Sequence, residues 1–250
     1  DRSINSPSNF IDSNIIGTFN LLECSHQHYI NLSEERKKCF RFHHVSTDEV
    51  FGSLGDNGFF KEDSPYDPRS PYSASKASSD HLVNAWNHTY GLPVVVTNCS
   101  NNFGPWQYPE KLIPKTIINA FYQKPIDVYG EGLNVRDWLF VDDHAEAILL
   151  TCFNSLPGEK FCIGGNCERR NITLVKQICA FMDQLIPRNN SYENLIRFVK
   201  DRPGHDNRYA IDSSKIFKRF KWEPTKRFEE RLLQTVEWYI SNLNWVKGKI

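Results

Sequence analysis

The sequence predicts an α/β fold in which helices cover a parallel sheet and a smaller lobe follows toward the C-terminus. Strand-like and helix-like blocks alternate along the first part of the chain, as expected of β-α-β units. After about residue 104 the pattern changes, and short strand-like segments lie between amphipathic helices. We therefore expect one unit over residues 1–104 and a second over residues 105–250, with some elements of the second returning to the first sheet.

The first unit begins with a helix and a strand. Residues 8–28 carry apolar side chains at helical spacing, among them Phe10 and Leu22, and predict an amphipathic helix. The charged residues 32–39 are interpreted as a solvated connection, and the run FRFHHV, 40–45, as a strand.

A long helix and a buried strand complete this unit. The helix is expected over about residues 72–90, because Ser70 suits its N-cap and Pro71 its first turn. Residues 93–100, PVVVTNCS, contain the β-branched run of a buried parallel strand.

Helices predominate in the second unit. The segments 171–185 (NITLVKQICAFMDQL) and 228–243 (FEERLLQTVEWYISNL) carry clear helical stripes. The short segments PIDVYG, 125–130, and WLFV, 138–141, read as strands between helices. No internal repeat is visible.

Bulk composition excludes several function classes. Thirty basic and thirty acidic side chains cancel, so no net field favours nucleic acid or an anionic membrane. No apolar run approaches the roughly 18 residues that span a bilayer. The seven cysteines are an odd number and include no C-x-x-C pair, which indicates reduced thiols in a cytoplasmic protein and argues against a disulfide framework or a zinc ribbon.

One glycine pattern resembles a phosphate-binding turn. Gly52, Gly55 and Gly58 are spaced as in dinucleotide-binding loops. Such a turn must open a helix so that its amide groups face the phosphate. The next residues, FFKEDSPYDP, contain two prolines and no helical stripe. We therefore expect a flexible loop here and no phosphate site.

Tyr72 and Lys76 lie four residues apart, on one face of the predicted helix. A free tyrosine has a pKa of about 10, and a nearby ammonium group favours the phenolate and lowers that pKa. Such pairs also occur on solvent-facing helices. Catalysis is favoured here because Thr47 places a hydroxyl at the end of the preceding strand.

A strand-end hydroxyl followed by Y-x-x-x-K on the next helix resembles the extended short-chain dehydrogenase/reductase family. The longer segments STDEVFG, SPYSASKASSDHLV, TNCSNNFGP, PEKLIP, RDWLFVDDHAEA and DRPGHDNRYAID are similar to those of its dTDP-glucose 4,6-dehydratase branch. The similarity runs from the first residues to about Trp245.

The resemblance implies a Rossmann-type doubly wound sheet, tightly held NAD, and a C-terminal lobe that binds a nucleotide sugar. It implies that Tyr72, assisted by Thr47 and Lys76, removes the proton of the sugar 4-hydroxyl while C4 gives a hydride to NAD. Glu49 would then take the C5 proton, and protonated Asp48 would donate to the departing 6-hydroxyl. Elimination needs one acid and one base, and neighbouring carboxylates split their pKa values. The alternative is that Asp48 and Glu49 are solvated loop acids.

The resemblance also assigns the binding residues. The nucleotide sugar would contact Thr47, Asn101, Lys111, Leu112, Tyr129, Arg136, Asn171, Asp201, Arg202, Pro203, Gly204 and His205. Arg136 and Arg202 are the candidates for the diphosphate, because guanidinium groups match phosphate oxygens. The cofactor would contact Ser13, Tyr72, Lys76 and Asn102, and no residue is assigned to a metal. A homodimer, formed through the helices that hold Phe19 and Tyr72, is implied as well.

Three features depart from the family pattern. Asp127 stands near the expected base site, where an acid could weaken nucleotide contact or alter base preference. Ser13 replaces the usual threonine. The glycine-rich turn of the family and the acid that binds the adenosine ribose would lie before residue 1, so we expect the chain as given to bind NAD weakly or not at all.

Two other functions stay open. Another extended dehydrogenase, such as a nucleotide-sugar epimerase or a UDP-glucose 4,6-dehydratase, would share the Tyr72 and Lys76 pair. A non-catalytic remnant would bind nucleotide sugar without turnover.

Overall fold

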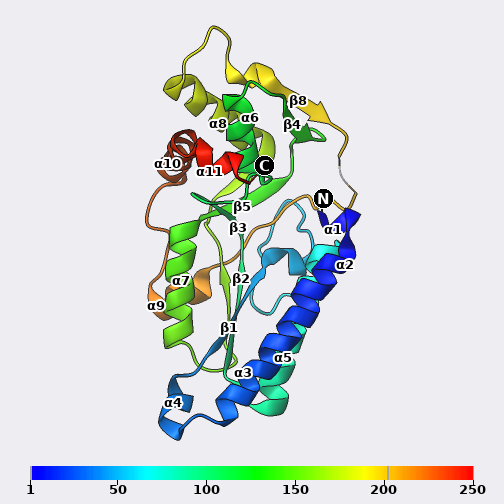
Figure 1. Ribbon diagram of the computed structural model, residues 1–250, viewed down its shortest axis with the longest axis vertical. Helices are drawn as coiled ribbons and strands as arrows, with labels where there is room; N and C mark the ends of the chain where they lie inside the picture. Colours follow the sequence, from blue (N-terminus) through cyan, green and yellow to red (C-terminus); the bar gives the residue numbers. More distant parts are fainter. Residues whose placement is uncertain (1, 202, 250) are drawn as a thin grey trace.

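A three-stranded parallel sheet lies at the centre of the lower part of the molecule in Figure 1. The computed structural model describes residues 2–201 and 203–249. β1 (Phe42–Thr47), β2 (Val94–Cys99) and β6 (Lys160–Ile163) lie in the order β1-β2-β6. The predicted α/β fold is therefore confirmed, and β6 returns from the second half of the chain as expected.

Helices cover both faces of this sheet. α3 (Gly17–Ile30) and α5 (Pro71–Tyr90) lie on one side, and α7 (Val141–Asn154) and α9 (Ser214–Phe220) lie on the other (Figure 1). This arrangement is the doubly wound pattern, in which ligands bind beyond the carboxyl ends of the strands.

α5 has well-defined ends. The Ser70 hydroxyl accepts from the Ser73 amide and Ser73 bonds back to Ser70, which closes a reciprocal cap, and Pro71 occupies the first turn. Gly91 ends the helix at a positive φ of 67°. The predicted start and end of this helix are confirmed, which fixes the position of Tyr72 and Lys76.

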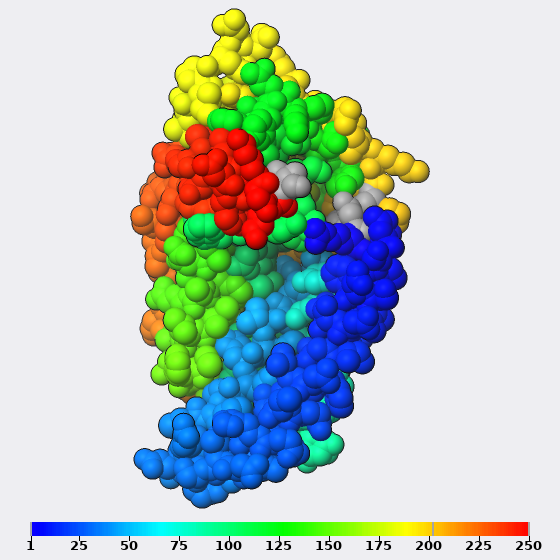
Figure 2. Space-filling view, in the orientation of Figure 1, coloured from blue at the N-terminus to red at the C-terminus, as the bar shows by residue number. Residues whose placement is uncertain are grey.

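The N-terminal helix is longer and less regular than expected. α1 (Arg2–Asn5) and α2 (Pro7–Phe10) lead into a π-helical segment, η1 (Ile11–Ile16), which continues into α3. In Figure 2 the first, dark-blue residues of this segment reach the upper lobe. It thereby borders the space between the sheet and the lobe.

The interpretation of residues 32–39 as a connection was wrong in part. Glu34–Cys39 form a helix, α4, capped by the Ser33 hydroxyl, which accepts from the Arg36 amide. Glu34 lies in its first turn and Lys38 in its last, so both complement the helix dipole.

The upper lobe contains two small sheets and a cluster of helices. In one of these sheets, β3 (Asn101–Phe103) pairs in parallel with β5 (Val135–Phe140), and β5 pairs antiparallel with β7 (Glu168–Arg170). In the other, β4 (Ile126–Tyr129) pairs in parallel with β8 (Ile196–Val199). The main helices of the lobe are α6 (Leu112–Phe121), α8 (Asn171–Leu185), α10 (Phe228–Ser241) and α11 (Leu243–Lys247), with the short 3-10 helix η3 (Tyr192–Leu195). A second short 3-10 helix, η2 (Asp48–Phe51), follows β1 of the three-stranded parallel sheet.

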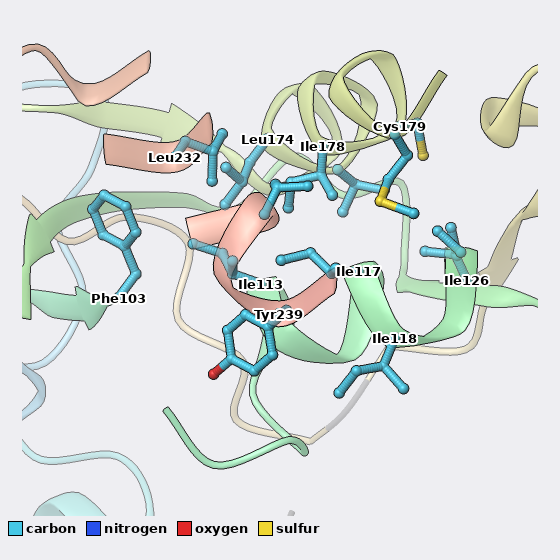
Figure 3. Close-up of a cluster of buried hydrophobic side chains, with 14 of the residues drawn as sticks. Phe103, Ile113, Ile117, Ile118, Ile126, Leu174, Ile178, Cys179, Leu232 and Tyr239 are labelled. Atoms are coloured by element: carbon cyan, nitrogen blue, oxygen red, sulfur yellow. The ribbon is translucent and has the colours of Figure 1, made fainter. Parts of the chain in front are cut away.

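The core of this lobe lies between α6, α8 and α10. Figure 3 shows Ile113 and Ile117 of α6 facing Leu174 and Ile178 of α8, with Leu232 beside them. These side chains are fully buried or nearly so. The chain enters the lobe directly from β2, since only Ser100 separates β2 from β3. The end of the first sheet and the lobe are therefore joined at that point.

The glycine pattern leads into a loop, as predicted. No helix begins between Gly52 and Ser70 in the described chain, which removes the context that a phosphate-binding turn needs. The loop is nevertheless tied down, because the Arg208 guanidinium donates to the carbonyls of Gly58 (2.9 Å) and Gly55 (3.4 Å).

Candidate active site

A cavity of about 460 Å³ lies between the carboxyl end of β1, the start of α5 and the upper lobe. It brings together most of the residues that the resemblance assigned to the site. Those that line it are Glu49, Tyr72, Asn101, Lys111, Leu112, Tyr129, Arg136, Asn171, Pro203, Gly204 and His205.

Thr47 lies at the end of the cavity formed by β1 and α5. It is the last residue of β1, and its hydroxyl accepts from the Glu49 amide (3.2 Å), which caps η2. The same hydroxyl donates to Asp48 Oδ1 (3.2 Å). The turn after the strand thus sends Asp48 inward, where it is buried, while Glu49 is half-buried and lines the cavity.

The pKa of the Asp48 carboxyl is raised well above its ordinary value. Burial is the main cause, and the nearby carboxylates Glu49 and Asp137 add to it, while Arg136 and the hydrogen bond from Thr47 act in the opposite direction. Asp48 Oδ2 is buried and has no hydrogen-bond partner among the described residues. These properties suit a carboxyl group that keeps its proton at neutral pH.

Tyr72 differs from the sequence-based expectation. Its pKa is raised rather than lowered, first because burial disfavours the phenolate and next because Glu49, Cys99 and Asp48 lie nearby; an interaction with the Thr47 hydroxyl opposes this. The Lys76 ammonium donates to the Val45 carbonyl (2.9 Å). The expected lowering is not observed, because burial is the largest influence on the Tyr72 pKa; the Lys76 ammonium is bonded to the strand backbone instead.

Lys76 has a lowered pKa of its own. Burial is the largest cause, and Asp80 and Cys99 oppose it by favouring the ammonium form.

Phe10 of α2 packs edge-on against the Tyr72 ring, with centroids 6.0 Å apart. The N-terminal segment therefore helps to hold the phenol at the cavity wall.

The opposite end of the cavity is lined by residues of the lobe. Asn101 begins β3 and Asn171 begins α8. The side-chain oxygens of both are buried and have no hydrogen-bond partner among the described residues. A buried amide oxygen without a partner is costly, so these atoms are suited to a ligand that donates hydrogen bonds.

Arg136 is buried in the wall of this cavity and well anchored. Its guanidinium donates to the carbonyls of Val135 (2.7 Å), Asp206 (2.8 Å) and Asn207 (3.3 Å), and it stacks on the Tyr209 ring at 4.2 Å. Tyr209 in turn donates to Asp206. A guanidinium held this rigidly loses little conformational entropy when an anion binds near it.

Six of the assigned residues that the structure describes do not line the cavity. Thr47 and Asp48 lie behind Glu49, and Lys76 lies one turn beyond Tyr72. Asp201 is exposed and bonds His205 (2.6 Å), so it acts from behind the cavity wall. Ser13 is exposed on η1. Arg202 lies outside the described residues.

Asn102 also stands apart from the cavity. Its amide nitrogen donates to the Ser100 carbonyl (3.0 Å), and its oxygen is bonded to His144 Nδ1 (2.8 Å). Burial lowers the pKa of His144 to about 4, and the nearby His43 adds to this. His144 Nε2 is buried and has no partner among the described residues, so a neutral imidazole nitrogen next to Asn102 can still bond a ligand.

The sequence reasoning missed several residues of the cavity wall. Lys115 lies one helical turn after Lys111, so the i, i+4 spacing of α6 could have identified it. Trp138 lies two residues after Arg136 on β5, where strand alternation gives the same face. Tyr209 and Asp206 were quoted within DRPGHDNRYAID, but no local signal indicated that their segment folds back onto Arg136.

No group of three or more His, Cys, Asp or Glu side chains is placed to hold a metal ion in the described ranges. Within the same ranges, none of the helices is long and apolar enough to cross a membrane.

Comparison with known proteins gives consistent matches. A family model described as GDP-mannose 4,6 dehydratase matches residues 1–235. The probable dTDP-glucose 4,6-dehydratase of Sinorhizobium fredii is 55% identical over 245 residues, which cover 98% of this chain and 70% of the relative. The dTDP-glucose 4,6-dehydratase of Neisseria meningitidis is 54% identical over 250 residues, with the same two coverages, 98% and 70%.

Solved structures resemble the chain as well. The dTDP-glucose 4,6-dehydratase of Bacillus anthracis, in complex with NAD, has a TM-score of 0.85 at 45% identity and covers 96% of this chain and 71% of its own. The enzyme of that name from Streptomyces venezuelae, with NAD and TYD bound, has a TM-score of 0.89 at 40% identity, covering 100% and 72%. The chain therefore belongs to the dTDP-glucose 4,6-dehydratase family, as its motifs predicted.

Proposed function

We propose that this protein is a dTDP-glucose 4,6-dehydratase, a lyase that converts dTDP-glucose into dTDP-4-keto-6-deoxyglucose and water. The observation that carries the proposal is the pairing of a buried Asp48, whose pKa is raised, with a half-buried Glu49 on the wall of the cavity that Tyr72 also lines. Oxidation at C4 alone needs neither acid. Elimination of water across C5 and C6 needs both.

The residues present fit the nicotinamide end of NAD. Tyr72 and Lys76 lie beyond the carboxyl ends of parallel strands, where dinucleotides bind in this fold, and His144 Nε2 beside Asn102 is a buried nitrogen without a partner among the described residues. Tyr72, Lys76, Asn102 and Ser13 are the residues proposed to hold it. When bound, NAD would supply a reversible hydride acceptor for the hydrogen that leaves C4 and is later returned to C6.

The proton transfers are assigned to three side chains. Tyr72, with Lys76 one turn away, is assigned the 4-hydroxyl proton; because burial raises its pKa, it takes that proton only after loss of its own. The resulting ketone acidifies the C5 proton, which Glu49 removes as general base. Asp48 gives its proton to the departing 6-hydroxyl, so the oxygen leaves as water, and Glu49 returns a proton to C5 when C6 is reduced.

The lobe is proposed to bind the nucleotide. Arg136 and Arg202 are assigned to the diphosphate, with Pro203, Gly204 and His205 lining that wall and Asp201 bonded to His205 behind it. Asn101 and Asn171 offer buried oxygens to donors on the ligand. Lys111, Leu112 and Tyr129 complete this part of the cavity. In this assignment residues 1–104 carry the cofactor side and the chemistry, and residues 105–250 mainly the nucleotide-sugar side.

Three broader assignments accompany this function. We propose a cytoplasmic enzyme, since all seven cysteines are free. We propose a homodimer formed through α3 and α5, because Phe19 on α3 is 40% exposed beside Trp86 of α5. The product, a 4-keto-6-deoxy sugar nucleotide, suits the synthesis of deoxysugars such as rhamnose.

Replacing Glu49 with Gln tests the dehydratase against an epimerase. The variant is expected to oxidise C4 but to stall at elimination, with product formation reduced about 10²- to 10⁴-fold. Keto-sugar absorbance measures the product, and reduction of NAD in a single turnover measures the oxidation. Glu110→Gln is the control, since Glu110 lines the same cavity and pairs with Arg2.

Turnover of Glu49→Gln at the parent rate would contradict the dehydratase. Calorimetry with dTDP-glucose and UDP-glucose, run beside the same assay, distinguishes the remaining alternatives. A preference for UDP-glucose would favour the uridine enzyme, and tight binding without product by the parent chain would favour a non-catalytic remnant.

A further inference from the structure

A buried carboxylate on α5 is not used by the proposed chemistry. Asp80 lies one helical turn after Lys76 and its side chain is inaccessible to solvent. Its Oδ1 accepts from His44 Nε2 (2.9 Å), and its Oδ2 accepts from the hydroxyls of Ser46 (2.9 Å) and Tyr66 (2.8 Å) and from Asn98 Nδ2 (3.2 Å). Four donors thus converge on one carboxyl group, which we call the Asp80 network.

The donors come from the elements that carry the catalytic side chains. His44 and Ser46 belong to β1, and Ser46 directly precedes Thr47. Asn98 of β2 donates to Asp80 and also to the Thr47 backbone carbonyl (3.0 Å). Asp80 therefore connects the helix that holds Tyr72 and Lys76 to the strand end that holds Thr47.

The network also has a defined charge. Burial alone would raise the pKa of Asp80, but the hydrogen bonds from His44, Ser46 and Tyr66 outweigh it and hold that pKa below its ordinary value. Lys160 of β6 donates to the Tyr66 hydroxyl (3.0 Å) and lies over its ring at 4.5 Å. The Lys160 ammonium and the Asp80 carboxylate are therefore both bonded to the Tyr66 hydroxyl.

The Asp80 carboxylate favours the charged form of Lys76. The titratable groups that act on Lys76 are Asp80 on its own helix and Cys99 on β2. Burial raises the pKa of Cys99 to about 12, so its thiol is neutral at neutral pH. Asp80 is then the ionised group among those that favour the ammonium form of Lys76.

We propose that Asp80 is a positioning residue for the proton transfer at Tyr72: its carboxylate fixes α5 against the carboxyl ends of β1 and β2 and keeps Lys76 protonated. The inference rests on the proposed function, because it gives Lys76 a role beside Tyr72. Asp80 itself touches neither Tyr72 nor the cavity wall.

The test is Asp80→Asn, which keeps the shape and removes the charge. The pKa of Lys76, followed by NMR of isotope-labelled lysines and assigned with Lys76→Arg, is expected to fall by about one unit. The alkaline limb of the pH profile of kcat is expected to move down with it, because Lys76 must stay charged. kcat is expected to fall about 10- to 100-fold, with the affinity for dTDP measured by calorimetry unchanged.

Tyr66→Phe is the matched control. It removes one buried donor to the same carboxylate but leaves the charge, so thermal stability should fall while the pKa of Lys76 stays in place. An unmoved Lys76 pKa in Asp80→Asn, or an equal shift in Tyr66→Phe, overturns the inference. The NMR titration needs no turnover, so this failure is distinct from failure of the dehydratase assignment, which an inactive parent would signal.

Ser46→Ala covers the case in which Asp80→Asn does not fold. This variant keeps the anion and cuts the link beside Thr47, so kcat should fall about threefold or more with dTDP affinity and the Lys76 pKa retained. A Ser46→Ala enzyme with the kcat of the parent overturns the positioning role.

Discussion

The two ends of the cavity are built in different ways. At the end formed by β1 and α5, the polar groups are hydrogen-bonded to one another. The Thr47 hydroxyl donates to Asp48 and accepts from the Glu49 amide, and Asn98 donates to the Thr47 carbonyl. At the lobe end, the buried oxygens of Asn101 and Asn171 have no partner among the described residues. Chemistry needs groups fixed before the substrate arrives, whereas binding uses groups that the ligand itself completes.

Asp48 combines both features. One of its oxygens is bonded to Thr47, and the other is buried without a partner among the described residues. The protein thus holds the carboxyl group through one oxygen, and the raised pKa suits the other to the proton that the proposed elimination needs. The comparison predicts that changes at the catalytic end alter kcat, and that changes at the lobe end alter affinity.

Asp48→Asn should have the largest effect. An amide cannot donate the proton that the leaving hydroxyl needs, so kcat is expected to fall about 10²- to 10⁴-fold, while dTDP affinity, measured by calorimetry, stays near that of the parent. Because the pKa of Asp48 is raised in the folded state, the parent loses stability as pH rises above about 3.9, the unfolded-state value. The Asp48→Asn variant has no carboxyl group at this position, so its stability should not fall with pH for this reason.

Thermal unfolding checks the stability half of that prediction. The variant should gain over the parent as pH rises from about 4 to about 7. Asp142→Asn, at an exposed carboxyl on α7, is the control and should show no such gain. An Asp48→Asn enzyme that turns over normally would remove the distinction between the two ends.

Asn171→Ala should have an intermediate effect at the opposite end. Loss of a buried acceptor that the ligand completes is expected to weaken dTDP binding about tenfold, or about 1.4 kcal/mol. kcat at saturating substrate should change little. Calorimetry and steady-state kinetics measure the two, and Asn154→Ala on the exposed part of α7 is the control. A large loss of kcat with affinity retained would place Asn171 with the catalytic groups.

Asp127→Asn should have the smallest effect. Asp127 lines the cavity but pairs with Arg197 at 2.7 Å, and Arg197 is 60% exposed. An exposed pair contributes about 0–1 kcal/mol, so removing the acid should strengthen binding of the anionic dTDP by less than about threefold. Calorimetry with dTDP and UDP measures this. A larger change in the ratio of the affinities for dTDP and UDP would mean that Asp127 contributes to recognition of the base.

The sequence predicted the catalytic end better than the lobe. Y-x-x-x-K spacing and a strand-end hydroxyl are local features, and the structure keeps Tyr72, Lys76 and Thr47 where local geometry places them. The lobe wall is assembled from β3, α6, β4, β5 and the segment around Tyr209, which are far apart in sequence. Lys115 and Trp138 follow simple periodicities and could have been found, but the stacking of Tyr209 on Arg136 could not.

What the sequence determined by itself was the order of helices and strands and the identity of the groups at the turn after β1, because both depend on neighbours within a few residues. Only the tertiary structure decided how the pKa values of those groups shift. The pKa of Asp48 is raised because the fold removes water from it and brings Asp137 close, and the pKa of Tyr72 is raised because burial disfavours the phenolate. Desolvation depends on everything packed around a group, so it cannot be read from the residues beside it in the chain.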